Sequence, residues 1–412
     1  MVGRLREIAG PLGNRKFLLL WIGRSMSLLG DGILPVALTL AIIKGTGSAA
    51  DLGLVLAAEA VPQLVLLLVG GVWADRLPRR WVMFSADVLN LAAQTAMGTE
   101  LLVSGVHIPH LMIFAACAGT ANAFFWPASD AIVPATVATT QLPSANALLG
   151  LSKQIGIVLG PAIATTLAVT VGAGWAMLAN AVTYAISLGT LALLRVAHVP
   201  AERAGFWTEL RQGWRELWRH TWYWTNLIAH SCWNLARSAY QTLGPLVAVT
   251  MLGGQVSWGM IAQGAAVGGL IGAFVALRIR PRRPLVVGNL ALALGCVPPA
   301  LLAVPVTAPV IAVAAGFMYG GLTVLNALWQ TTVQQRIPAQ SLSRVMSYDW
   351  LVSLGLTPLG QALAGPIAAG VGTRTTLIGA AVLVGVSCLG MLALPAVWQL
   401  SGTPREPQLT ES

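Results

Sequence analysis

The chain has 412 residues, of which 56% are hydrophobic and only 9% are charged. Because a soluble domain carries about 25% charged residues, this composition excludes a soluble globular protein and predicts a chain surrounded mostly by lipid. The net charge of +10 does not indicate a nucleic-acid partner, since the basic residues lie in short gaps between apolar runs. The four cysteines all fall within apolar runs and form no CxxC pair, so we expect no metal site and no cofactor.

Apolar runs separated by glycine, proline and charged residues predict twelve membrane-spanning helices. Each run is long enough to cross a bilayer, which takes ~20 apolar residues, and the runs form two sets of six. We therefore expect an all-α membrane protein made of two pseudo-symmetric six-helix bundles. The predicted spans are 16–43, 51–74, 81–103, 108–130, 143–170, 173–194, 222–251, 256–278, 285–304, 308–334, 341–369 and 374–398.

The basic residues between the spans predict the orientation of the chain. Nineteen Lys and Arg residues lie on the side of the N-terminus, and only Lys44 and Arg374 lie on the other side. Positive charge collects on the cytoplasmic side of membrane proteins, so we expect both termini in the cytoplasm. The predicted divisions are a first bundle at 1–194, a cytoplasmic linker at 195–221, a second bundle at 222–400 and a disordered tail at 401–412.

The linker between the bundles contains an amphipathic pattern. Aromatic residues and leucines recur at helical spacing, and Glu and Arg occupy the remaining positions. This pattern predicts a helix in the inner membrane interface, with Arg attracted to anionic headgroups and Trp fixing the depth. A plain linker between the halves is compatible with the same residues. The apolar positions are Phe206, Trp207, Leu210, Trp214, Leu217 and Trp218.

Two opposite charges, Asp31 and Arg237, interrupt long apolar runs near their middles. A shift of 206 positions superposes them (31 + 206 = 237), so they occupy equivalent places in the two halves. Because such a charge costs roughly 2.5–3.5 kcal/mol at the centre of a spanning helix, it usually faces a wet cavity or a partner. We interpret Asp31 as a group that exchanges a proton or contacts a cation, with Arg237 tuning it. A static ion pair that fixes helix packing is the alternative.

Other ionisable residues within the spans have less distinctive positions. Glu59, about eight residues into the second span, is the alternative proton site, and Lys153 either faces the cavity or reaches towards the inner surface. Asp87 lies near the inner end of the third span and is expected to join the cytoplasmic charges. We expect Glu100 to be a solvated charge at the outer rim, and the five histidines show no arrangement typical of a metal site.

The loop between the second and third spans reads GVWADRLPRR from Gly71 to Arg80. It resembles the signature loop of the major facilitator superfamily, with Pro78 where that family usually has Gly. The resemblance implies that Asp75 and the arginines bridge to the other bundle and close the cytoplasmic side. Alternatively, the arginines only hold the topology by binding lipid phosphates. The predicted gate comprises Gly71, Asp75, Arg76, Arg79, Arg80, Asp130, Arg344 and Asp349.

The fifth span carries Gly156, Gly160 and Pro161, which resemble the Gly-Pro motif in helix five of the superfamily's exporters. Small residues four apart allow close helix contact, and proline removes a backbone hydrogen bond. Ordinary helix packing is the alternative explanation. The stretches LPSANAL (142–148) and RVMS (344–347) resemble the bacterial branch that includes macrolide efflux proteins and enterobactin exporters. The resemblance therefore implies export in a bacterial inner membrane.

A small-molecule substrate needs polar and aromatic contacts in a central cavity. Five residues of the second half offer them, although each is also a plausible packing residue. They are Tyr240, Gln263, Asn326, Trp329 and Gln330.

The sequence contains no GxxxxGK[ST] motif, so the chain has no means to use ATP by itself and we expect no enzyme activity. We predict a proton-coupled exporter of small amphipathic molecules (a drug, siderophore or secondary metabolite). Its expected partners are the substrate, protons and membrane lipids, and we expect a monomer. An importer of a small polar metabolite and a non-transporting membrane sensor are the alternatives. The helix-five glycines argue against the first, and the charges within the spans argue against the second.

Overall fold

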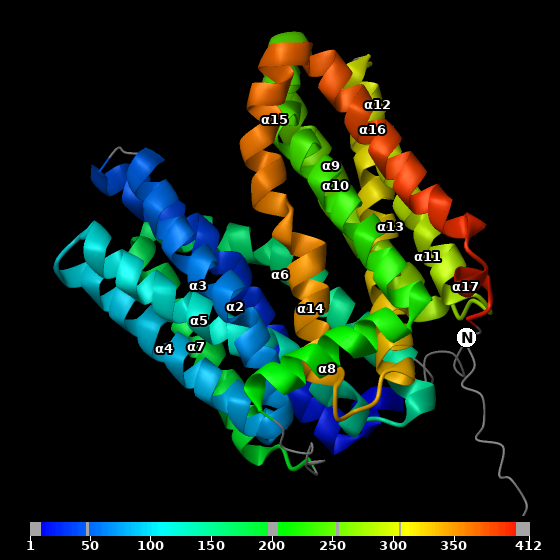
Figure 1. The fold of residues 1–412 in the computed structure, drawn as a ribbon. Coiled ribbons are helices and arrows are strands. Elements are labelled where there is room, and N and C mark those ends of the chain that lie inside the picture. Colours follow the sequence, from blue (N-terminus) through cyan, green and yellow to red (C-terminus); the bar gives the residue numbers. More distant parts are fainter. Residues whose placement is uncertain (1–9, 47–48, 197–204, 253–254, 305, 401–412) are drawn as a thin grey trace, which may run out of the picture. The chain divides into compact units, whose positions relative to one another are not determined.

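A computed structural model describes residues 10–46, 49–196, 205–252, 255–304 and 306–400 of the chain. Within these ranges the regular structure is helical (Figure 1). The chain divides into two compact units, one formed by residues 1–216 with 338–351 and the other by 217–337 with 352–412. The predicted tail at 401–412 and part of the predicted linker lie outside the described residues.

The first unit contains six long helices, which Figure 1 shows gathered side by side in blue to green. Helix α2 packs against α6 and α7, α3 packs against α5, and α4 packs against both α5 and α7. Helix α8 and most of α14 complete the unit. Its helices are α2 (Arg15–Thr46), α3 (Ala49–Arg76), α4 (Arg79–Val103), α5 (Ile108–Ile132), α6 (Leu142–Thr170), α7 (Ala173–Leu193), α8 (Phe206–Arg219) and α14 (Leu342–Gly355).

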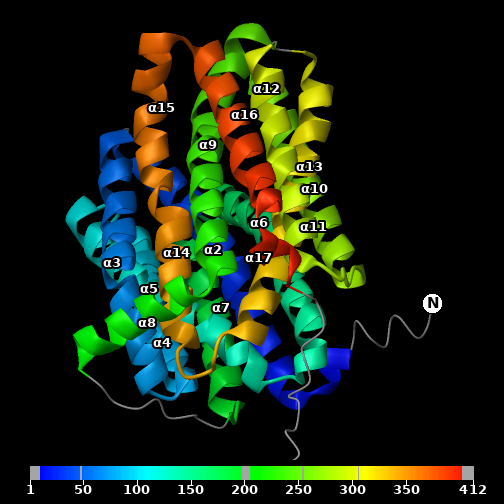
Figure 2. The same cartoon turned by 45° about the vertical axis from the view of Figure 1, so that its right-hand side comes forward.

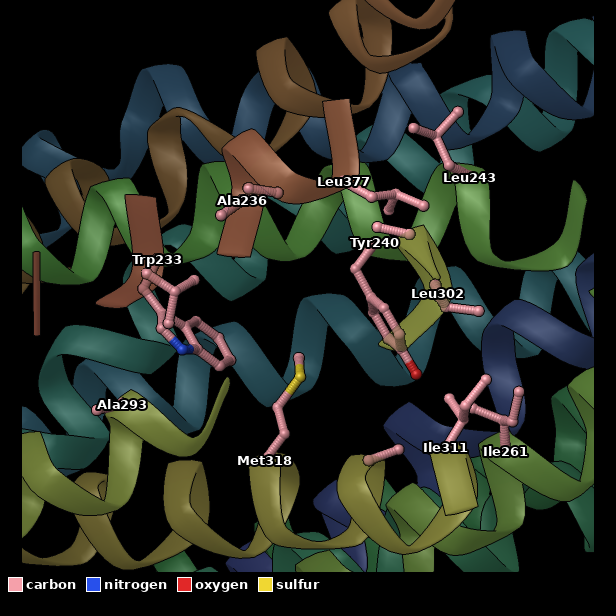
Figure 3. Close-up of a cluster of buried hydrophobic side chains, with 14 of the residues drawn as sticks. Trp233, Ala236, Tyr240, Leu243, Ile261, Ala293, Leu302, Ile311, Met318 and Leu377 are labelled. Carbon is pink, nitrogen blue, oxygen red and sulfur yellow. The ribbon is translucent and has the colours of Figure 1, made fainter. Parts of the chain in front are cut away.

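The second unit is built around α9, α10, α13 and α16. Helices α10 and α13 approach closely because Gly268 and Gly272 of α10 lie against the backbone of Gly316 and Gly320, where a Cβ would collide. A core of apolar side chains, including Trp233, fills the unit (Figure 3). Its helices are α9 (Thr221–Met251), α10 (Gln255–Arg278), α11 (Pro284–Ala293), α12 (Val297–Ala303), α13 (Ala308–Arg336), α15 (Thr357–Val371), α16 (Thr373–Gly390) and α17 (Pro395–Trp398).

Each of the twelve predicted spans falls on a helix or on a pair of consecutive helices. The ninth span is interrupted by a 3-10 turn before Pro298, and the eleventh is divided at Leu356, two residues before Pro358. Proline explains both breaks, because it cannot donate the backbone hydrogen bond that a continuous helix needs. The twelfth span is helical to Gly390 and ends in two short turns.

Ten helical segments of the described chain are both long and apolar enough to cross a membrane. The other two predicted spans are α4 and α9, which have 25 and 31 residues and therefore ample length. Their mean hydropathy is lower because their buried faces are polar. The polar residues are Asp87, Asn90 and Gln94 on α4, and Asn226 and Asn234 on α9. The two least apolar spans thus carry polar groups into the interiors of their units.

Candidate functional site

The motif carboxylate, Asp75, lies at the last turn of α3 and contacts the first turn of α14. Its two oxygens accept hydrogen bonds from the backbone N–H groups of Ser343 and Arg344, each at 3.1 Å. The side chains of Arg344 and Arg79 form ion pairs with it at 3.1 and 3.0 Å. Asp75 is 3% exposed, so its negative charge is compensated by two cations and by the N-terminus of α14.

Gly71 permits this close contact. A Cβ at Gly71 would collide with the side-chain hydroxyl of Ser347, and it would also lie 3.0 Å from the carbonyl oxygen of Ser343. The motif glycine therefore lets α3 approach α14 at the level of Asp75. Asp349, another residue of the predicted gate, lies on the same helix and is buried.

The three motif arginines bind several different segments of the first unit. Arg79 donates to the carbonyl oxygen of Ala131 at 2.8 Å and also to the carbonyl oxygen of Ala339. Arg76 forms an ion pair with Glu209 of α8 at 2.9 Å. Arg80 donates to the carbonyl oxygen of Leu194 at 2.7 Å, at the end of α7, where a cation is favourable. All three side chains therefore have protein partners.

Asp130 belongs to a second buried charge group near the first. Its partner is Arg24 of α2, at 3.0 Å, which the sequence analysis did not single out. The other carboxylate oxygen of Asp130 accepts a hydrogen bond from the indole of Trp350 at 3.0 Å. Lys153 lies over the face of the same indole, with its Nζ 5.7 Å from the ring centre. This group therefore joins α2, α5, α6 and α14.

Helix α8 turns a polar face towards the unit and an aromatic, basic face away from it. Glu209 is 1% exposed, whereas Trp207 is 79% exposed. Arg344 donates to the side chain of Gln212 at 3.3 Å, and the hydroxyl of Tyr348 donates to the carbonyl oxygen of Leu210 at 3.1 Å. Both views show α8 crossing the first turns of α14 (Figure 1, Figure 2). The predicted linker helix thus contacts the same arginine that binds Asp75.

Asp31 is half-buried on α2 and accepts a hydrogen bond from the hydroxyl of Tyr184 at 2.8 Å. Lys153 and Arg24 interact electrostatically with it. Glu59 of α3 is also within electrostatic range of Asp31. The first unit therefore places both predicted proton sites near one another, with two cations acting on Asp31.

The helix-five glycines pack directly against the helix that carries Asp31. A Cβ at Gly156 would collide with the backbone carbonyl of Leu28, and one at Gly160 would lie 2.5–2.6 Å from the backbone of Gly32. Pro161 follows within α6. The motif thus brings α6 into backbone contact with α2 one residue from Asp31.

Asp87 is not part of the cytoplasmic charge cluster, and that expectation was wrong. Its side chain is completely buried, and its carboxylate accepts a hydrogen bond from the hydroxyl of Ser187 at 2.6 Å. Asn90 and Gln94 lie on the same buried face of α4. The position of Asp87 along the span gave no indication of the helix face that it occupies, whereas the polar spacing of 87, 90 and 94 is a visible signal.

Glu100, expected to be a solvated charge at the outer rim, has two histidine neighbours. The Nδ1 atoms of His107 and His110 lie 3.2 and 2.6 Å from its Oε1. The three candidate ligand atoms lie within 4.8 Å of one another, an arrangement that can hold a metal ion. Two of the five histidines, His107 and His110, therefore lie together at Glu100, which their spacing in the sequence did not indicate.

Arg237 lies on α9 in the second unit and has local partners. It donates to the side-chain oxygen of Asn234 at 3.2 and 3.3 Å, and its guanidinium lies 5.7 Å from the ring centre of Trp233. Residues 217–337 and 352–400 contain no Asp or Glu. Among the described residues, the second unit therefore has no carboxylate to pair with Arg237.

The five substrate-cavity candidates divide into two groups. Tyr240 lies in the apolar core that Figure 3 shows, 3% exposed, and Trp329 stacks on Tyr223 with ring centres 5.1 Å apart. Gln263 and Asn326 are exposed on α10 and α13. Gln330 is half-buried, and its Oε1 has no hydrogen-bond partner among the described residues.

The profile of the Major Facilitator Superfamily matches residues 20–356. The chain belongs to this superfamily. It is 27% identical over 386 residues to the multidrug efflux pump Tap of Mycolicibacterium fortuitum, covering 89% of this chain and 91% of that protein. It is 26% identical over 408 residues to the enterobactin exporter EntS of Salmonella choleraesuis, covering 96% and 95%. Macrolide efflux protein A of Streptococcus pyogenes is 23% identical over 265 residues, covering 62% and 65%.

Solved structures show the same fold. A bacterial homologue of the iron transporter ferroportin has a TM-score of 0.74 at 19% identity, with 92% of this chain and 99% of that chain covered. The Escherichia coli fucose:proton symporter FucP has a TM-score of 0.69 at 11% identity, with 92% and 98% covered. The predicted superfamily, its drug and siderophore efflux branch, and the all-α membrane fold are therefore confirmed.

Proposed function

We propose that this protein is a secondary active exporter of small amphipathic molecules, which couples their exit from a bacterial cell to proton entry. The relatives are named for multidrug, macrolide and enterobactin efflux, and these compounds combine apolar bodies with polar groups. The observation that carries proton coupling is Asp31, an acid within a span, held by Tyr184 and packed against the helix-five glycines.

Energetics are compatible with one proton per substrate. Moving one proton down ~100 mV supplies roughly 2.3 kcal/mol, and a tenfold substrate gradient costs about 1.4 kcal/mol. One proton therefore supports an accumulation of tens-fold. In this mechanism Asp31 takes up a proton when it faces the outside and releases it when it faces the inside, because its environment changes with the conformation. Glu59 is the second candidate for this role, and Arg237 modulates it from the other half.

The Asp75 contacts form the cytoplasmic gate in this proposal. Asp75, Arg79 and Arg344 hold α3 and the start of α14 together on the inner side. Arg24, Asp130 and Trp350 add a second group of contacts. Ion pairs near a water-exposed surface are individually weak, which suits contacts that must break in every transport cycle.

Helix α8 lies at the inner membrane interface in this proposal, with both termini in the cytoplasm. Its outward face carries Trp207, Trp214 and Trp218, which are 79%, 44% and 47% exposed, together with Arg211 and Arg215. Tryptophan anchors a helix at headgroup depth, and arginine binds anionic headgroups. The protein acts as a monomer with lipids as partners.

Everted membrane vesicles test the direction of transport. We expect respiration-energised everted vesicles to accumulate radiolabelled erythromycin or ethidium, because protons then leave the acidic lumen as substrate enters. A protonophore and the Asp31→Asn variant should both abolish accumulation. Loading only of right-side-out vesicles would identify an importer, and absence of loading in either orientation with these probes and enterobactin would favour a non-transporting sensor.

A further inference from the structure

The buried face of α4 is polar where a spanning helix is normally apolar. Asp87, Asn90 and Gln94 are at most 1% exposed. Positions i, i+3 and i+7 share one face of a helix, so these side chains form a continuous strip inside the first unit. Hydrogen bonds from Ser187 of α7 to Asp87 and from Asn90 to Asn122 of α5 show which helices cover the strip.

Among the described residues, the strip leaves more acceptor oxygens than donor nitrogens without a hydrogen-bond partner. Ser187 donates to Oδ2 of Asp87, but Oδ1 has no hydrogen-bond partner among the described residues. The Oδ1 of Asn90 and the Oε1 of Gln94 are likewise buried without a partner in that part of the chain, and the Nε2 of Gln94 is an unpaired donor. Because buried polar atoms are nearly always satisfied, three unpaired acceptors on one strip require a proton, a cation or water.

The charges around the strip favour a proton. Among the described residues, the charge that acts on Asp87 is the carboxyl of Asp31, which is repulsive when both are ionised. A buried carboxylate with no cation beside it is very unfavourable, whereas a proton on Oδ1 removes the charge and supplies a donor. Other titratable or polar groups around the strip are Tyr184 and Ser187 of α7, Asn122 of α5, and Glu59 of α3, while Arg24 and Lys153 act on Asp31.

We propose that Asp87 is a second proton-binding site, protonated on Oδ1 in this conformation and coupled to Asp31 across α7. Tyr184 donates to Asp31 at 2.8 Å and Ser187 donates to Asp87 at 2.6 Å. These hydroxyls are three residues apart and therefore share one helix face. A change of charge at Asp31 thus alters the proton occupancy of Asp87. The contribution of this proton to transport rests on the proton coupling proposed above, but the site itself does not.

Infrared difference spectroscopy of the purified full-length protein during a pH titration tests the site without any substrate. At neutral pH we expect the carbonyl stretch of a buried protonated carboxyl in the wild type. This band should be lost in Asp87→Asn and kept in Asp51→Asn, whose carboxyl lies in the first turn of α3. In Asp31→Asn the band should persist but disappear at a different pH. Asparagine closely matches protonated aspartate in shape, so Asp87→Asn should fold.

The controls separate the possible outcomes. A band that survives in Asp87→Asn protein with wild-type elution and melting would overturn the proposal, as would its absence from the wild type. If sodium chloride but not choline chloride raises the melting temperature, and no carboxyl band is seen, the strip binds a cation instead of a proton. Ser187→Ala should keep the band and shift its frequency, because it loses one hydrogen bond. If the wild type exports erythromycin with a proton gradient but shows no carboxyl band, only the Asp87 site is rejected. If the wild type shows the band but no such export, only the proposed proton coupling is rejected.

Discussion

The two compact units differ most in where they carry acids. The first unit holds Asp31, Glu59 and Asp87 within its spans, with Asp75 and Asp130 at the ends of theirs. The second unit has no Asp or Glu in residues 217–337 or 352–400. Its polar interior consists of neutral groups such as Asn226 and Asn289, joined by a hydrogen bond at 2.8 Å. The pseudo-repeat is therefore preserved in helix order and not in chemistry.

This difference has a consequence for mechanism. Protonation removes the charge of a carboxyl within a span. We therefore expect a carboxyl that carries the proposed proton to belong to the first unit, where the acids of the described spans lie. The second unit can contribute shape, neutral polar contacts and the positive charge of Arg237. The proposed mechanism therefore assigns proton handling to the first unit, because the second has no carboxylate side chain among its described residues.

The largest expected effect comes from neutralising Asp31. Asp31→Asn should reduce proton-driven accumulation of erythromycin in everted vesicles from tens-fold to about one, because one proton accounts for that gradient. Substrate exchange without a pH gradient should continue, since asparagine resembles the protonated acid. Asp51→Asn, which removes an acid in the first turn of α3, is the matched control. Unchanged accumulation in Asp31→Asn would remove this residue from the coupling mechanism.

The proposed gate at Asp75 gives the next largest expected effect. Asp75→Asn keeps the shape of the side chain but loses its charge-assisted hydrogen bonds, each worth about 1.5–3 kcal/mol. We expect roughly thirtyfold slower export, equivalent to about 2 kcal/mol. A cysteine at Ser343 should also become more reactive towards a maleimide added from the cytoplasmic side. Arg80→Gln is the control, since Arg80 binds the end of α7 instead. Equal reactivity of Ser343→Cys with and without Asp75→Asn would contradict a gate.

Sequence alone predicted the helices well because apolar length is a local property. The motif loop was also predictable, since its glycine, acid and arginines lie within ten residues. The divisions of the ninth and eleventh spans were not predicted, although Pro298 and Pro358 mark them.

Long-range contacts explain what the sequence did not predict. Arg24 and Asp130 are 106 positions apart, and nothing in either run indicates that they meet. Asp87 was assigned to the cytoplasmic charges from its position along the span. Its partners depend instead on the helix face that it occupies. In α8 the apolar pattern was visible, but the contacts of Glu209 with Arg76 and of Gln212 with Arg344 depend on how the helix lies against the unit.

Substitution of Arg237 tests whether the second unit contributes to proton-coupled transport. Arg237→Gln should slow proton-driven export about tenfold, equivalent to about 1.4 kcal/mol, while accumulation at equilibrium persists because the acids remain. Arg237→Lys should be intermediate, since it keeps the charge and loses the planar fork. A double-mutant cycle with Asp31→Asn distinguishes a static ion pair. If the two substitutions change the melting temperature non-additively but leave the export rate unchanged, Asp31 and Arg237 form a static ion pair without a role in transport.

The smallest expected effect concerns the linker helix, which belongs to the acid-rich unit yet has a basic outer face. If α8 lies on anionic lipid, phosphatidylglycerol should raise the melting temperature of the purified protein, because a ligand of the folded state stabilises it.

Arg211→Gln and Arg215→Gln should each weaken this lipid effect roughly fivefold, since an arginine near such a surface contributes about 1 kcal/mol. Arg282→Gln, an exposed arginine between α10 and α11, makes the same charge change elsewhere and should leave the effect intact. If a variant that combines Arg211→Gln and Arg215→Gln responds to phosphatidylglycerol as the wild type does, the lipid acts at another surface and α8 is a plain linker. If the response is lost in both arginine variants, α8 is the helix that binds the anionic lipid, and its exposed tryptophans also lie against that lipid. One helix then contacts both the bilayer and Arg344, the arginine that binds Asp75.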